Sequence, residues 1–283
     1  MGADFPLPGM GRAVVAVAAP AGGPGHWAGA SSVVVDPDGG FVAAYRVRNG
    51  HEGVDQTVVA RSSDGERFDT VATLTGLGGR WMERPALVRT PVGRWRLYTC
   101  SGAPATKRWW IDVLEADDPA GLAAAAPRPA FPGDELTAVK DPVVRLVDGR
   151  WHAWICCHPL DVPGDEDRMS SAYATSADGL AWEWHRTVLA GRPGRWDARG
   201  ARLTTVLPDG RAAYDGRASA AENWFERTGL ARSSGGAFVA DDGPPVADVR
   251  YLDVLPLGGG FRIYYEARLP DESHELRTER IGI

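Results

Sequence analysis

Four acidic side chains stand beside short apolar runs, where carboxylates could act as acids, bases or nucleophiles. They are Glu83, Asp141, Asp215 and Glu266. Arginines stand at comparable positions, and each guanidinium presents a planar fork of donors that suits carboxylates and phosphates. These are Arg46, Arg84, Arg202, Arg217, Arg250 and Arg268. Removing such charges from water is costly unless they are paired or used. Two interpretations stay open: a ligand or catalytic site, or a network in which arginines neutralise the acids.

Further candidates are less specific. His158 follows an apolar run and could act as an acid or base near neutrality, although a hydrogen-bonded loop histidine is the simpler interpretation. Trp27 and Trp81 lie near strand ends and could line a pocket, or simply pack. The acidic residues at 161–167 could bind a cation, but they are more typical of a solvated loop, so we predict no metal site. The glycines at 22–25 lack the helix and lysine of a phosphate loop, and we predict no cofactor.

The elements that must position these residues form a repeat of about fifty residues. Each copy joins two apolar runs through a turn glycine, and the second run usually ends in an aromatic residue. The turn glycines lie 53, 56, 61 and 50 residues apart, at Gly40, Gly93, Gly149, Gly210 and Gly260. Asp-Gly or Gly-Gly between apolar runs indicates a β-hairpin. The repeat therefore predicts one hairpin per copy.

A second motif adds another hairpin to several copies. It reads Ser62-Ser63-Asp64-Gly65 after the first hairpin and Ser176-Ala177-Asp178-Gly179 after the third. Two hairpins make a four-stranded sheet, and five such sheets predict an all-β, five-bladed β-propeller spanning residues 1–283 as a single domain. The last copy lacks one strand, which we expect residues 13–19 to supply, so that an N-terminal strand closes the last blade. A β-sandwich is the alternative.

Composition limits the function classes. The chain has 31 basic and 37 acidic residues, and a net charge of −6 argues against nucleic-acid binding by charge alone. The longest apolar run, at 13–20, is far shorter than the roughly 20 residues of a membrane span and makes a poor signal peptide. Three cysteines without a framework indicate reduced thiols. We expect a cytoplasmic protein that binds neither membranes nor nucleic acids.

Two short motifs strengthen one family resemblance. The repeat and its Ser-x-Asp-Gly turn resemble those of the five-bladed propeller glycoside hydrolases, above all families 43 and 32. Lys140-Asp141-Pro142-Val143 is similar to the Asp-Pro-x-Val start of a blade and to the Arg-Asp-Pro motif of family 32. Trp81-Met82-Glu83-Arg84-Pro85 resembles the Glu-Cys-Pro element that carries the acid/base in family 32. The resemblance covers nearly the whole chain at the level of architecture.

The resemblance implies three inward acids: a base or nucleophile, a carboxylate that orients the substrate, and a general acid. Glycoside cleavage needs a proton for the leaving oxygen and a second carboxylate that attacks the sugar or activates water. On this basis Glu83 is the general acid, and Asp141 is the orienting residue or base. The chain departs from the pattern at Ala30-Ser31-Ser32, where the first acid belongs, and in the order of Glu83 and Asp141. Asp215 or Glu266 could supply the missing carboxylate.

The sequence therefore leads to two main hypotheses. The first is a glycoside-hydrolase-like enzyme that uses paired carboxylates at the channel mouth on a small sugar-like or anionic substrate. The arginines favour an anion such as a uronate, a phosphorylated sugar or a small carboxylate. The second is a non-hydrolytic propeller, either a binding protein or an enzyme recruited to another reaction, with an arginine-rich site for an anionic ligand. A protein-interaction platform is a third, against which the charged mouth argues.

Overall fold

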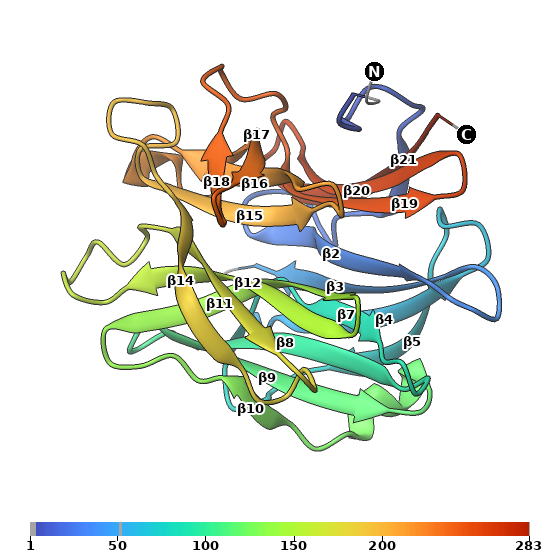
Figure 1. The fold of residues 1–283 in the computed structure, drawn as a ribbon. Helices are drawn as coiled ribbons and strands as arrows, with labels where there is room; N and C mark the ends of the chain where they lie inside the picture. Colours follow the sequence, from blue (N-terminus) through green and yellow to red (C-terminus); the bar gives the residue numbers. More distant parts are fainter. Residues whose placement is uncertain (1–3, 51–52, 283) are drawn as a thin grey trace.

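The structure is a computed structural model that describes residues 4–50 and 53–282. The strands form one eight-stranded sheet, one five-stranded sheet and two four-stranded sheets, which divide along the chain into five units of antiparallel strands (Figure 1). The first contains β2 (His26–Val35), β3 (Phe41–Asn49), β4 (Gln56–Ser62) and β5 (Asp69–Leu74). The second has two short inner strands, β6 (Trp81–Met82) and β7 (Ala86–Arg89), followed by β8 (Trp95–Ala103), β9 (Arg108–Ala116) and β10 (Arg128–Phe131).

The remaining blades repeat this order. The third contains β11 (Thr137–Val147), β12 (Arg150–Pro159), β13 (Ser170–Ser176) and β14 (Glu183–Ala190). The fourth contains β15 (Gly200–Val206), β16 (Arg211–Arg217), β17 (Arg227–Ser234) and β18 (Ala237–Ala240). The fifth contains β19 (Arg250–Leu257), β20 (Gly260–Arg268), β21 (His274–Ile281) and the N-terminal β1 (Val14–Val17).

The predicted closure by an N-terminal strand is confirmed. β1 pairs antiparallel with β21, with Val14 opposite Thr278. In addition, β2 of the first blade pairs with β21 at one position, where Trp27 lies opposite His274. The two ends of the chain accordingly lie near each other beside β21 (Figure 1). Closure removes the open edge that the last blade would otherwise present.

Apolar clusters seal the spaces between neighbouring blades. One cluster joins the first and second blades, and others join each following pair, including the fifth and first. Trp95 and Trp151 are fully buried in them, while Trp154 and Trp182 pack against their edges. All four tryptophans therefore pack between neighbouring blades. The inner strands are buried on both faces, as β15 is along its whole length.

The Ser-x-Asp-Gly motif forms its turn through local hydrogen bonds. Ser176 Oγ accepts from the backbone N–H of Gly179 at 2.9 Å, and Asp178 Oδ1 accepts from that of Leu180 at 2.8 Å. Gly179 has a φ of +73°, and a Cβ there would lie 2.8 Å from the ring of Trp151. The carbonyl oxygen of Gly179 accepts a hydrogen bond from Tyr98 Oη of the second blade at 2.6 Å. The motif therefore both turns the chain and ties two blades together.

Helical structure is confined to two short 3-10 turns in the part of the chain that the structure describes. η1 (Pro119–Ala124) lies between β9 and β10, and η2 (Ala220–Glu222) lies between β16 and β17. Asp118 Oδ1 caps η1 by accepting from the backbone N–H of Ala120 at 2.8 Å. Within residues 4–50 and 53–282, no helix is both long and apolar enough to cross a membrane.

Candidate ligand site at one mouth of the channel

The inner strands that line the central channel are irregular. The pairing register shifts within β2, β11 and β15 and at the start of β19, as in a β-bulge. Three residues within these irregularities are left-handed: Ala30, Asp141 and Tyr251, with φ of +52°, +51° and +52°. In the second blade, Glu83 and Arg84 fill the break between β6 and β7. Bulges re-aim side chains, and strain of this kind concentrates at functional sites.

Arg202 is the centre of one buried cluster. Its Nη1 lies 2.8 Å from Asp141 Oδ2 and 2.9 Å from Tyr251 Oη, and its Nη2 lies 2.6 Å from Asp215 Oδ2. Tyr251 Oη also lies 3.2 Å from Glu83 Oε2. These side chains come from four different blades, so one guanidinium helps to hold the mouth together.

Arg46 is the centre of a second cluster. Its Nη1 lies 2.5 Å from Glu83 Oε2 and its Nη2 lies 2.6 Å from Glu266 Oε2, with the arginine side chain wholly buried. Glu83 Oε1 is also 3.4 Å from Arg48 Nη2 and 3.8 Å from Lys140 Nζ. Burial opposes ionisation of Glu83, but the charges of Arg46, Lys140 and Arg48 outweigh it and hold its pKa well below the ordinary value.

Glu226 connects two further arginines and was missed in the sequence. Its Oε2 lies 2.8 Å from Arg250 Nε, and its Oε1 pairs with Arg217. Arg250 Nη1 in turn lies 3.0 Å from Glu266 Oε1, which also lies 2.6 Å from His274 Nδ1. Burial opposes ionisation of both glutamates, yet the neighbouring arginines lower each pKa to about 2.

Asp215 is the exception among the four predicted carboxylates. Burial raises its pKa, and this effect exceeds the opposing charge of Arg202. Both of its oxygens also accept from the backbone N–H of Tyr251, at 3.2 and 3.1 Å. It has no exposed surface. Asp215 therefore supports the inner strand of the fifth blade from inside the protein.

Members of this network line a cavity of about 220 Å³. That volume is below the roughly 300–1,000 Å³ of drug-sized pockets, so it fits a small ligand. Six of the residues proposed from the sequence line it: Trp81, Glu83, His158, Arg202, Arg217 and Arg250. Ten further lining residues were not among those candidates: Arg48, Lys107, Trp109, Lys140, Glu166, Asp167, Met169, Asn223, Trp224 and Glu226.

The other proposed residues lie elsewhere. Asp141, Asp215, Glu266 and Arg46 are buried in the network. Trp27 is buried with its ring stacked on His274, centroid to centroid at 5.0 Å.

Arg84 and Arg268 were predicted to bind a ligand at the mouth, but neither side chain lines the cavity. Arg84 donates from Nε to the carbonyl of Ser31 at 3.1 Å and from Nη1 to that of Thr204 at 2.6 Å, so it links three blades. Arg268 pairs with Asp248 at 2.8 Å, and neither it nor Arg84 lines the cavity.

Two lysines and two tryptophans form one wall of the cavity. Lys107 Nζ lies 5.2 Å from the ring centroid of Trp81, and Lys140 Nζ lies 4.7 Å from that of Trp109. The two indole rings stack on each other at 5.8 Å with an interplanar angle of 20°. The chain has only these two lysines among its 31 basic residues. That scarcity was the available sequence signal for this wall.

His158 is held in place by both ring nitrogens. Nδ1 lies 2.8 Å from the carbonyl oxygen of Glu166, and Nε2 lies 3.4 Å from Cys156 Sγ. Burial lowers the pKa of His158 well below its ordinary value, and the charge of Lys140 adds to the effect. The imidazole is therefore neutral at pH 7.

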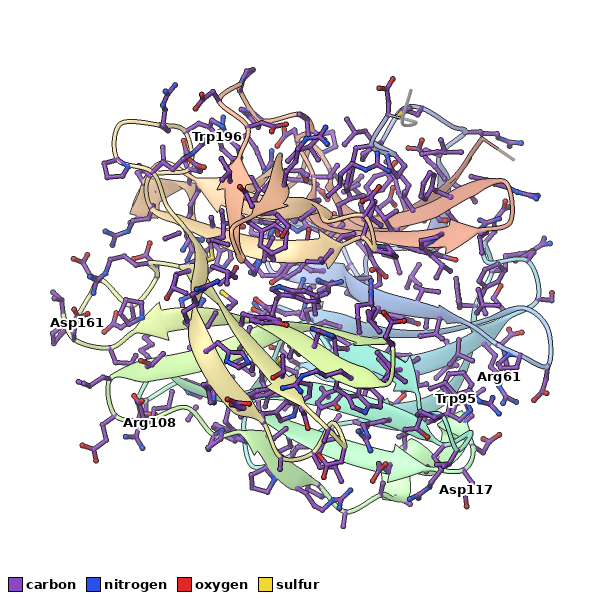
Figure 2. The ribbon with its side chains drawn as sticks, viewed as in Figure 1. Arg61, Trp95, Arg108, Asp117, Asp161 and Trp196 are labelled. Atoms are coloured by element: carbon purple, nitrogen blue, oxygen red, sulfur yellow. The ribbon has the colours of Figure 1, made fainter. Side chains whose placement is uncertain are left out.

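The acidic loop at 161–167 is tied to arginines. Asp165 and Asp167 lie 2.7 and 2.6 Å from Arg199 Nη2, and Asp161 pairs with Arg168 at the outer edge of the molecule (Figure 2). Within residues 4–50 and 53–282, no three His, Cys, Asp or Glu side chains gather in a way that could hold a metal ion.

The closed ring of blades defines the class of fold: the chain is a β-propeller. No protein-family model and no curated protein sequence matches it. Among solved structures, it is similar to a thermostable family-43 glycoside hydrolase, with a TM-score of 0.67, 13% identity, and coverage of 94% of this chain and 92% of that one.

Two further solved structures extend the comparison. The Listeria innocua β-1,2-mannobiose phosphorylase gives a TM-score of 0.66 at 12% identity, covering 98% of this chain and 93% of that one. The Bombyx mori family-32 β-fructofuranosidase gives 0.68 at 12% identity, covering 95% of this chain and 62% of that one. At such low identity these likenesses establish the fold alone.

Proposed function

We propose that the chain binds a small anionic sugar in the 220 Å³ cavity at the mouth of the channel where the ionic network lies, called the charged mouth below. We also propose that it does not hydrolyse glycosides through paired carboxylates. One observation carries this proposal: each carboxylate expected to act in catalysis has an arginine nitrogen within 2.8 Å. The separations are 2.5 Å for Glu83, 2.8 Å for Asp141, 2.6 Å for Asp215 and 2.6 Å for Glu266.

Hydrolysis would need a proton donor with a raised pKa and a second carboxylate free to attack the sugar or activate water. Glu83 and Glu226 line the cavity, but their pKa values are lowered, so both are ionised at pH 7. The other carboxylates on the wall, Glu166 and Asp167, also have lowered pKa values. Asp215 has a raised pKa but does not line the cavity. These observations favour binding over glycoside hydrolysis.

The lysine wall supports an anionic ligand. Lys140 Nζ lies 3.8 Å from Glu83 and 3.9 Å from Asp141, which are long contacts compared with the arginine pairs. Lys107 has no carboxylate within 4 Å among the described residues. These ammonium groups are therefore the cavity's least neutralised cations. A sugar ring could stack on Trp81 or Trp109 while its carboxylate or phosphate pairs with the ammonium groups of the two lysines.

Binding of three matched ligands tests the proposal. We expect glucuronate and glucose 6-phosphate to bind at least about tenfold more tightly than glucose in isothermal titration calorimetry. Lys140→Met should weaken binding of both anions by about tenfold. Arg108→Met, which removes an exposed cation beside the cavity without changing its lining, is the control. Equal affinity for glucose and its anionic relatives would contradict the anionic class.

The non-hydrolytic part has a separate test. We expect no release of p-nitrophenol from a panel of p-nitrophenyl glycosides beyond the rate of the Glu83→Gln variant. Turnover that the wild-type chain supports and Glu83→Gln lacks would show that the ion-paired carboxylate acts in hydrolysis after all.

Phosphorolysis is a second candidate function, favoured by the lysine wall. In that reaction inorganic phosphate attacks the anomeric carbon in place of a carboxylate or water, and the glycosidic bond breaks as the leaving sugar oxygen takes a proton from the phosphate. A cationic wall could hold the phosphate. One of the similar structures is a β-1,2-mannobiose phosphorylase, which gives a substrate to test. Formation of mannose 1-phosphate from β-1,2-mannobiose and phosphate would establish this candidate. A lack of phosphate-dependent cleavage would leave binding alone.

A further inference from the structure

The opposite mouth of the channel is apolar. The inner strands of all five blades end there, around a cavity of about 450 Å³, which is within the size range of small-molecule sites. One or more apolar side chains from each blade line it, among them Val34, Val88, Leu146, Val206 and Leu255. No carboxylate is among its lining residues.

The cavity continues into a groove between the third and fourth blades. A neighbouring cavity of about 290 Å³ shares Val147, Trp154 and Leu207 with it and reaches Tyr173 and Phe238. The ring of Trp154 lies 5.7 Å from that of Tyr173 and 6.4 Å from that of Phe238. The combined space is elongated, apolar and partly walled by aromatic rings.

Two arginines are the charged residues that line this mouth, Arg89 and Arg145. Arg145 Nη2 lies 3.7 Å from Asp253 Oδ1, and Arg84 Nη2 lies 3.5 Å from the same oxygen. Two guanidinium groups therefore share one carboxylate at the base of the channel. Burial lowers the pKa of Arg84, and the charge of Arg145 lowers it further against the opposing effect of Asp253. A negative charge beside Arg145 would relieve this excess.

Arg89 also shares its carboxylate with a second arginine. Its Nη1 lies 3.7 Å from Asp36 Oδ1, while Arg61, which also pairs with Asp118 at 3.2 Å, has its Nε 3.7 Å from the other oxygen of Asp36. The side chains of Arg89 and Arg145 are 28% and 33% exposed, so a dissolved ligand can reach both. The apolar mouth thus combines an apolar groove with two arginines, Arg89 and Arg145, each of which shares its carboxylate partner with another arginine.

We propose that this mouth is a second binding site, for a small molecule with an apolar body and one anionic group. An acyl or aryl carboxylate has this chemistry. Its carboxylate would pair with Arg145, and its apolar body would lie along the groove between Trp154 and Leu207. The site is separate from the charged mouth and does not depend on the function proposed there.

Decanoate and decanol are matched probes, because they share an apolar chain and differ in charge. We expect both to bind in equilibrium dialysis, with decanoate tighter. Arg145→Met should weaken decanoate binding by about tenfold and leave decanol binding unchanged. Arg67→Met removes an arginine whose side chain is 90% exposed and should affect neither probe.

A second variant separates loss of binding from loss of folding. Val147 is 42% exposed at the edge of the groove, so Val147→Glu should fold normally, place a negative charge beside the site and weaken decanoate binding by at least tenfold. Decanoate affinity unchanged in both Arg145→Met and Val147→Glu would overturn the proposal. So would failure of the wild-type chain to bind either probe at millimolar concentration.

Discussion

The two mouths of the channel are built from opposite ends of the same five inner strands, yet they bury opposite kinds of side chain. At the charged mouth, Arg202 and Arg46 hold carboxylates from several blades. At the strand ends, Val206 and its counterparts meet around an apolar cavity. In the fifth blade the irregular pairing lies at the start of β19, between Arg250 and Asp253, and the rest of that strand pairs regularly. A bulge allows a polar side chain to be aimed, whereas apolar contacts need only the right face and volume.

The largest effect is expected from breaking the charged mouth. Arg202→Met would leave Asp141 and Asp215 buried without their shared cation, which should cost about 3–5 kcal/mol of unfolding free energy. Urea unfolding at pH 7.5 measures it. Arg145→Met, at the apolar mouth, is the matched control and should cost less than about 1 kcal/mol, because that arginine is one-third exposed. Similar costs for the two variants would remove the distinction between the mouths.

A smaller loss is expected at the apolar mouth when volume is removed. Leu87 is 1% exposed and lines the 450 Å³ cavity. Leu87→Ala should cost about 2–3 kcal/mol, in the lower part of the range for such changes, because the side chain already borders open space and loses fewer contacts. Its cost should not change with added salt. A strong salt dependence in urea unfolding would mean that the variant disturbs the ionic network as well.

The charged mouth should also make the fold sensitive to acid. Burial holds His158 neutral in the folded state by lowering its pKa, whereas the unfolded chain takes up a proton near pH 6.5. Below pH 6.5 the unfolded state binds more protons, so stability falls with pH until the folded-state pKa is reached. The slope is at most about 1.4 kcal/mol per pH unit for one histidine.

Urea unfolding at pH 7.5, 6.5 and 5.5 tests this expectation. His158→Gln should flatten the profile in that range, whereas His152→Gln, in the groove of the apolar mouth, should flatten it less, because His152 is less deeply buried. The paired glutamates add a further loss only below about pH 4.5, as Glu226 and Glu266 begin to protonate in the unfolded chain. An equal effect of both histidine variants would contradict the comparison.

The fold could be predicted because its signals are local. Turn glycines at a regular spacing give the hairpins, and the hydroxyl and carboxylate of Ser176 and Asp178 close the second turn within four residues. The strand at 13–19 could be placed because the last repeat was one strand short. None of these predictions depends on the direction in which a side chain points across the channel.

The site was harder to predict because its contacts cross the channel. Asp141 and Tyr251 sit in bulges with a left-handed backbone, and one extra residue in a strand changes the face to which the following side chains point. The sequence left open whether the arginines bind a ligand or neutralise acids, and Arg46 and Arg202 have acid partners. Lys140 entered the sequence argument only as the neighbour of Asp141, although its ammonium group lines the cavity.

The smallest effect is expected from an ion pair of the same chemistry on the surface. Arg94 Nε lies 3.0 Å from Asp117 Oδ1, but their side chains are 43% and 91% exposed, and Asp117 points outward at the edge of the molecule (Figure 2). Asp117→Asn should cost less than about 0.5 kcal/mol, and the cost should vanish in high salt. Asp215→Asn, the same substitution inside the network, should cost several times more, because it leaves Arg202 with a weaker partner away from water. Urea unfolding of both variants at low and high salt compares them directly. If the two costs were equal, burial would not be what distinguishes the charged mouth from the rest of the surface.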